Sequence, residues 1–239
     1  MAVSVLVDSS VYISLRYPQD RNHDRALRAV AALGGPSRLT LNAALEVAHI
    51  TREKLGEIVK AVYSRTEVRS QEVSPGEKRT QVTSVLRALD AERRLGTFTK
   101  VVEDYCLKEI REARDDLRLL PEWVRDEVRR VALDVLAFSA VKSLRELPGC
   151  RTKEDLEYVK ECEDAIGDGA ITGARDRKIF YDVVVTAREG MKVIFATFDK
   201  RFAGEANMAI KALEAADLLV KGTVEVYNLT TGSPTIPPR

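Results

Sequence analysis

Acidic residues end two apolar segments that have the composition of buried strands. The first segment, V-S-V-L-V, is followed by Asp8, and the second, K-V-I-F-A-T-F, is followed by Asp199. Open parallel sheets bind ligands at the carboxyl ends of their strands, so both aspartates are candidates for one crevice. Two more acids could join them if their helices border that crevice. These are Glu46, near a helix start, and Asp182, inside the apolar run I-F-Y-D-V-V-V.

Carboxylates gathered in one crevice would need a cation. Two such charges at about 4 Å repel by about 4 kcal/mol at an effective dielectric of about 20. An all-oxygen site of Asp and Glu suits Mg²⁺ or Mn²⁺ better than zinc. Two divalent ions can activate a water and stabilise the leaving oxygen of a phosphodiester. The pattern therefore predicts metal-dependent phosphodiester hydrolysis.

Each acid also has a purely structural interpretation. Asp8 could shape the turn after a strand, Glu46 could favour a helix N-terminus through the helix dipole, and Asp199 could be a solvated loop residue. Asp182 is the hardest to explain in this way, because burying an unpaired carboxylate is costly.

The elements that must position these acids predict an α/β fold, since strands and helices alternate at both ends of the chain. Residues 178–190 are rich in β-branched side chains, but their length and the terminal Gly190 favour a helix over a strand. Asn42 is positioned to cap the helix that carries Glu46. We expect strands at 3–7, 38–41, 192–199 and 223–229, and helices at 20–33, 43–59, 178–190 and 204–217.

Residues 57–150 have the pattern of successive helices. Start signals include the capping box Ser74–Glu77 and the helix-opening Pro121. We therefore expect a discontinuous domain made of 1–56 and 151–230, a helical insertion at 57–150, and a loose tail at 231–239.

Four segments resemble, in order, the signature segments of PIN-domain nucleases. They are V-L-V-D-S-S-V-Y-I-S-L, T-L-N-A-A-L-E-V-A-H, F-Y-D-V-V-V-T-A-R-E-G and V-I-F-A-T-F-D-K-R-F. The resemblance covers about 1–55 and 165–230. It implies a parallel-sheet, three-layer α/β/α domain, and the helical insertion departs from the minimal pattern of the family.

The resemblance implies an endoribonuclease that hydrolyses RNA with Mg²⁺ or Mn²⁺. In this chain the implied catalytic and metal-binding residues are Asp8, Glu46, Asp182 and Asp199, with Ser10 and Thr197 assisting. Substrate phosphates also need cations near the acids. The candidates are Arg175, Arg177, Lys178, Lys200 and Arg201.

Other readings of the chemistry remain open. A phosphatase of the haloacid-dehalogenase type would need D-x-D after the first strand, where this chain has D-S-S. The chain could instead be a PIN-fold module that binds RNA or protein and has weak or no nuclease activity. Asp164 and Asp168 could add a ligand or serve the turn after a helix, and His49 has the pattern of a surface or core residue.

The composition excludes only a strong overall charge on the protein. The net charge of +1 gives no general attraction to nucleic acid or anionic lipid, so any such binding must be local. No segment approaches the roughly 20 apolar residues of a membrane span. The three cysteines have neither disulfide-framework nor metal-site spacing. We expect a cytoplasmic protein whose partners are RNA and, through the insertion, a second copy or another protein.

Overall fold

A computed structural model describes most of the chain. The described residues are 3–34, 36–68, 70, 72–93, 95–111, 117–149, 151–167, 169–188 and 190–231. Apart from its first residue, the tail predicted at 231–239 lies outside the described residues.

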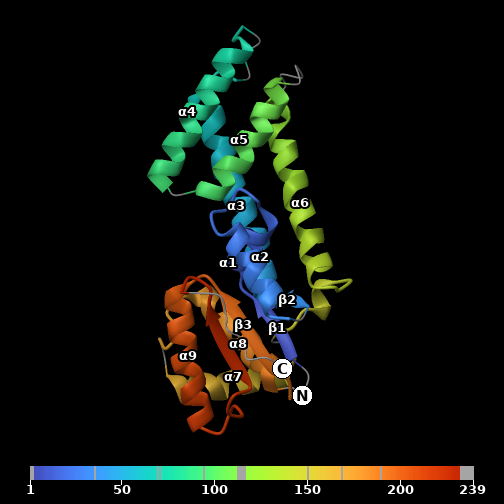
Figure 1. Ribbon diagram of the computed structural model, residues 1–239, viewed down its shortest axis with the longest axis vertical. Coiled ribbons are helices and arrows are strands. Elements are labelled where there is room, and N and C mark those ends of the chain that lie inside the picture. The colour runs from blue at the N-terminus through green and yellow to red at the C-terminus, as the bar shows by residue number, and fades with distance from the viewer. Residues whose placement is uncertain are drawn as a thin grey trace. The chain divides into compact units, whose positions relative to one another are not determined.

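Four strands in the described part of the chain form one parallel sheet in the order β2-β1-β3-β4 (Figure 1). All three strand pairings are parallel. The prediction of an α/β fold with a parallel sheet is therefore confirmed. The strands are β1 (Val3–Val7), β2 (Ser37–Leu39), β3 (Lys192–Thr197) and β4 (Val224–Asn228).

The two central strands are covered on both faces. Successive residues of β1, from Val5 to Val7, are buried, and so are those of β3 from Val193 to Thr197. Because neighbouring side chains of a strand point to opposite faces, both faces of the sheet must be covered. This burial is compatible with an α/β/α layering and explains why these strands are apolar without alternation.

Helices follow the strands much as the sequence predicts. They are α1 (Ser9–Arg16), α2 (His23–Ala32), α3 (Leu41–Arg65), α7 (Lys153–Ile166), α8 (Ala174–Arg188) and α9 (Lys200–Ala215). The helix expected at 178–190 is present, but it begins earlier, at Ala174. Alanine and arginine have high helix propensity, which favours a helix that includes Ala174, Arg175 and Arg177.

The chain divides into two compact units. The sheet unit contains 1–16, 22–47 and 134–239, and the helical unit contains 17–21 and 48–133. The boundaries lie at 48 and 133, whereas the sequence suggested 57 and 150. Both fall inside helices, α3 and α6, where no Gly or Pro marks a change. The helical unit includes α4 (Pro75–Arg93), α5 (Gly96–Arg111) and most of α6 (Leu120–Phe138).

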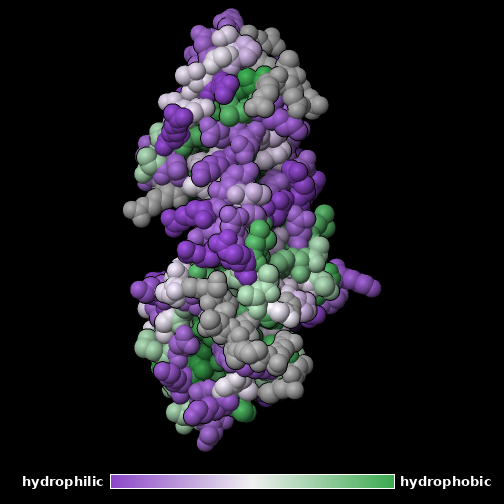
Figure 2. Space-filling model, viewed as in Figure 1, coloured by the Kyte–Doolittle hydropathy of each residue, from purple (hydrophilic) through white to green (hydrophobic). Residues whose placement is uncertain are grey.

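The surface of the helical unit is largely polar on the side seen in Figure 2. Its interior is apolar, with Leu55, Leu86 and Leu89 fully buried. Of the helices that the structure describes, none has both the length and the apolar character required to cross a membrane.

Candidate acidic active site

Asp8 lies at the carboxyl end of β1 and is held there by hydroxyl groups. Its Oδ2 accepts hydrogen bonds from Ser10 Oγ at 2.8 Å and from Thr197 Oγ1 at 2.9 Å. Its backbone N–H donates to the carbonyl of Ala196 at 2.9 Å, which continues the pairing of β1 with β3. The carboxylate is only 6% exposed. Ser10 and Thr197, which the sequence suggested as assisting residues, both contact it directly.

Asp199 lies beside Asp8 because Thr197 links the two. The Thr197 hydroxyl accepts the backbone N–H of Asp199 at 2.9 Å while it donates to Asp8. Asp199 Oδ1 in turn accepts the N–H of Phe202 at 2.9 Å and so caps α9. Oδ1 of Asp199 therefore caps the helix, and Oδ2 is the oxygen that could bind a cation.

Glu46 reaches the same place from α3. The Ser9 hydroxyl lies 2.6 Å from Glu46 Oε2 and 3.4 Å from Asp8 Oδ1. A hydroxyl has one proton, so Ser9 donates to the nearer oxygen of Glu46. One serine therefore brings the two carboxylates together. The D-S-S motif contained this residue, but the sequence drew attention only to the second serine.

The fourth acid of the cluster is Asp176. It lies in the first turn of α8, and the charges of both Asp8 and Asp199 act on it. Its carboxylate folds back over Gly173, where a β-carbon would stand 2.2 Å from Asp176 Oδ2. Sequence analysis missed this residue, because it lies in the polar stretch A-R-D-R. The signal that could have pointed to Asp176 is its position three residues after Gly173, the glycine just before the helix.

The structure places Asp182, which the sequence also put in the site, against the start of α3. It is 0% exposed and accepts the backbone N–H of Asn42 at 2.8 Å and the Asn42 amide Nδ2 at 3.0 Å. It therefore caps the N-terminus of α3, a role that the sequence had given to Asn42 itself. Six residues of helix separate it from Asp176, which turns the two side chains about 120° apart.

Two of the predicted cations lie against the acids. Arg201 Nη2 is 3.4 Å from Asp176 Oδ2, and Arg175 Nη1 is 4.0 Å from Glu46 Oε1. Both arginine side chains are more than half exposed, so each pair is screened by solvent. Lys200 is the exposed first residue of α9, while Arg177 and Lys178 follow Asp176 on α8.

Burial and mutual repulsion both act on the acids. Burial raises the pKa of Asp8, and the hydrogen bonds from the neighbouring hydroxyls oppose this effect. Burial also raises the pKa of Glu46. The hydrogen bond from Ser9 lowers it, and the charges of Asp8 and Asp176 raise it further.

Asp176 follows the same pattern. Burial raises its pKa, and the charges of Asp8 and Asp199 add to that increase, while the charge of Arg201 opposes it. The cluster thus holds more negative charge than its two arginines neutralise, and a bound cation would relieve the excess.

The donor set fits a hard divalent cation, because every donor is a carboxylate or hydroxyl oxygen. Within the described part of the chain, no three or more His, Cys, Asp and Glu side chains are already arranged to hold a metal ion. The acids would therefore have to turn toward a common point. Glu46 and Asp176, whose side chains are 13% and 22% exposed, are less tightly enclosed than Asp8.

Of three further candidates, the structure describes two, and both are exposed. His49 is exposed on α3 and lies 3.5 Å from Glu53 on the next turn. Asp164 is exposed on α7, and Asp168 lies outside the described residues.

Comparison with known proteins gave no relative. No family model, no curated protein and no solved structure matches this chain.

Proposed function

We propose that the chain is a metal-dependent endoribonuclease of the PIN type, with Mg²⁺ or Mn²⁺ held by Asp8, Glu46, Asp176 and Asp199. The observation that supports this proposal best is the meeting of these acids, from four distant segments, at the carboxyl edge of a parallel sheet. The order of the PIN-like segments that carry Asp8, Glu46 and Asp199 gives further support. Asp176 lies outside the third segment and takes the place of its Asp182 in this proposal.

The protein's own groups prepare the site in three ways. Ser10 and Thr197 fix the orientation of Asp8, and Ser9 fixes Glu46. Arg201 holds Asp176 and, being exposed, could contact a substrate phosphate instead. A divalent ion bound there would acidify a coordinated water and neutralise charge on the phosphate.

The test compares two aspartates of one helix. Asp176→Asn should lower Mn²⁺ affinity and the single-turnover cleavage of a labelled single-stranded RNA, each by about a hundredfold. Asp182→Asn, the matched control, should keep wild-type Mn²⁺ affinity. It should lower the melting temperature by a few degrees, because its new NH₂ group faces the NH₂ group of Asn42. Mn²⁺ affinity is measured by electron paramagnetic resonance of the free ion.

Two outcomes would contradict the proposal. Loss of Mn²⁺ binding in Asp182→Asn with retention in Asp176→Asn would show that the wrong acid has been assigned. Equal cleavage by wild type and Asp8→Asn would show that the acidic cluster is not the source of hydrolysis.

A second candidate is a module that binds RNA or protein without cleaving it. Two of the acids already face arginines, and such pairs stabilise the cluster without metal. This alternative predicts RNA binding by the wild-type protein with no cleavage in Mn²⁺.

A further inference from the structure

A groove of about 510 Å³ lies between α7 and α8 in the sheet unit. This volume is within the range of about 300–1,000 Å³ that small-ligand sites occupy. One wall is apolar and comes from Leu156 and Val159 of α7. Arg177 and Lys178 of α8 supply positive charge, and Asn42 supplies an amide. The acidic site uses none of these residues.

The groove adjoins the acidic site through two shared helices. On α3, Asn42 lines the groove, and Glu46, one turn further along, belongs to the acids. On α8, Asp176 belongs to the acids, and the next two residues, Arg177 and Lys178, line the groove. One helical turn is about 5.4 Å, so Asn42 in the groove and Glu46 in the acidic site are about this far apart along α3.

The cations of the groove differ from those of the acidic site. Among the described residues, neither the Arg177 nor the Lys178 side chain forms an ion pair or hydrogen bond with the protein. Arg175 and Arg201, in contrast, face acids. Two unneutralised cations beside one cavity favour an anionic ligand such as a phosphate.

The rest of the lining favours a planar, partly apolar group. Leu156 is 61% exposed, so its apolar side chain is open to a ligand in the groove. The Asn42 NH₂ group donates to both oxygens of Asp182, so the orientation of the amide is fixed. Its carbonyl oxygen then remains to accept a hydrogen bond, as an amide does when it contacts a base edge.

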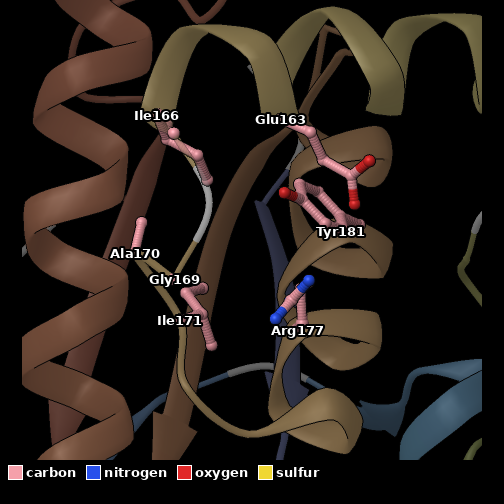
Figure 3. Close-up of a pocket in the computed structure, with 8 residues that line it drawn as sticks. Glu163, Ile166, Gly169, Ala170, Ile171, Arg177 and Tyr181 are labelled. Carbon is pink, nitrogen blue, oxygen red and sulfur yellow. The ribbon is translucent and has the colours of Figure 1, made fainter.

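Glu163 is the one acid among the residues that line the groove. Figure 3 shows a second pocket that shares Glu163, Arg177 and Tyr181 with the groove; there Glu163 of α7 lies beside the ring of Tyr181, and Arg177 lies on the preceding turn of α8. This carboxylate would repel a phosphate, so the anionic part of a ligand belongs near Arg177 and away from Glu163.

We propose that this groove binds one nucleotide of a single-stranded RNA adjacent to the bond that is cleaved. The base packs on Leu156 and Val159, and its phosphate contacts Arg177 and Lys178. A base enters such a groove only when it is unpaired and unstacked, which selects single strands over duplexes. The inference rests on the proposed function, since the neighbouring acids are taken as the place of cleavage.

The experiment measures binding without cleavage. Fluorescence anisotropy with a labelled seven-nucleotide RNA in EDTA gives the dissociation constant of the full chain. The variant is Arg177→Gln/Lys178→Gln, and the control, Lys211→Gln/Lys221→Gln, removes the same charge from exposed lysines outside the groove. Leu156→Ala tests the apolar wall with the same RNA and with an abasic strand of equal charge.

The groove variant should bind about tenfold more weakly. The slope of log affinity against log salt should also become shallower by about 0.7 for each lost phosphate contact. Leu156→Ala should weaken binding of the RNA about fivefold and leave the abasic strand unchanged. Glu163→Gln should strengthen binding, and the lysine control should match wild type. Melting temperatures verify that each variant is folded.

Three results would overturn the inference. They are equal binding by the groove variant and the lysine control, equal effects of Leu156→Ala on the RNA and the abasic strand, and a duplex that binds as tightly as the single strand. Failure of the proposed function would give a different result. If RNA binding in EDTA depends on the groove but Mn²⁺ supports no cleavage, the proposed binding groove stands and the proposed nuclease activity falls.

Discussion

At the scale of single residues, the orientation of Asp176 depends on a neighbour without a side chain. A β-carbon at Gly173 would lie 2.2 Å from Asp176 Oδ2 and 2.7 Å from its Cγ. Both separations are far inside van der Waals contact. Gly173 is thus the residue that lets this carboxylate fold back over the start of α8.

Gly173→Ala should therefore displace the Asp176 carboxylate and lower Mn²⁺ affinity at least tenfold, an effect of about 1.4 kcal/mol or more. Gly204→Ala is the matched control, because its added β-carbon meets no atom within 4 Å and it lies inside helix α9. The control should keep Mn²⁺ affinity and raise stability by about 0.5–1 kcal/mol. Isothermal titration with Mn²⁺ and thermal melts measure both effects. Unchanged affinity in Gly173→Ala would show that Mn²⁺ binding does not need the folded-back orientation of Asp176.

The sequence was sufficient to predict some site residues but not others. Asp8 and Asp199 could be predicted because each follows a buried apolar strand, and the ends of parallel strands share an edge. Asp176 could not, because a polar residue in a polar stretch gives no signal of burial. The apolar run around Asp182 correctly indicated a buried carboxylate, but burial alone does not distinguish a helix cap from a metal ligand.

At the scale of elements, β1 and β3 are joined at their carboxyl ends by the hydroxyl of Thr197. Thr197 is fully buried, and its single hydroxyl contacts an acidic residue at each strand end. The hydroxyl donates to the Asp8 carboxylate and accepts the backbone N–H of Asp199. The distance between these two acids is therefore set by one side chain.

Thr197→Val keeps the shape of the side chain and removes both hydrogen bonds. It should lower the free energy of unfolding by about 1–3 kcal/mol, because the Asp199 N–H loses its acceptor and Asp8 loses a donor. Mn²⁺ affinity should fall with it. Thr186→Val, which removes only a hydroxyl bond to the Asp182 carbonyl within α8, is the control and should have little effect. Equal losses in the two variants, measured by denaturant melts and Mn²⁺ titration, would contradict the bridging role.

Elements were easier to predict than their limits. The strands at both ends of the chain agree with the expected ones to within a few residues, since apolar β-branched runs are a strong local signal. The unit boundaries at 48 and 133 differ from the predicted 57 and 150, and α3 and α6 continue through them as regular helix. A helix that passes from one packing environment to another changes its neighbours, not its local sequence pattern.

At the scale of the whole molecule, the acidic cluster makes stability depend on pH and metal. Asp8, Glu46 and Asp176 all have raised pKa values in the folded chain, each chiefly through burial. A carboxyl group with a raised folded pKa binds its proton more tightly in the folded than in the unfolded state. Its contribution to stability is complete below the unfolded pKa of about 4 and is lost as pH rises through the folded pKa.

The metal-free protein should therefore lose stability from these groups as pH rises from about 4 through the raised folded pKa values. Asp8→Asn should flatten this dependence and raise the melting temperature in EDTA at neutral pH, because it removes a buried charge and keeps an oxygen for Ser10 and Thr197. Mn²⁺ should stabilise the wild-type protein more than the variant. Melting curves across pH, with and without Mn²⁺, measure this. If the stability of the wild-type protein instead rises with pH and does not differ from that of Asp8→Asn, the buried carboxylates do not destabilise the folded state.

The contact between Asp8 and Thr197 also has a consequence for the order of events during synthesis. These residues are 189 positions apart, and Asp199 follows two positions later. A ribosome makes Asp8 first and must add 189 more residues before Thr197 exists. A nascent polypeptide shorter than that therefore cannot assemble the cluster, and any activity of this site must wait until Asp199 has left the ribosome.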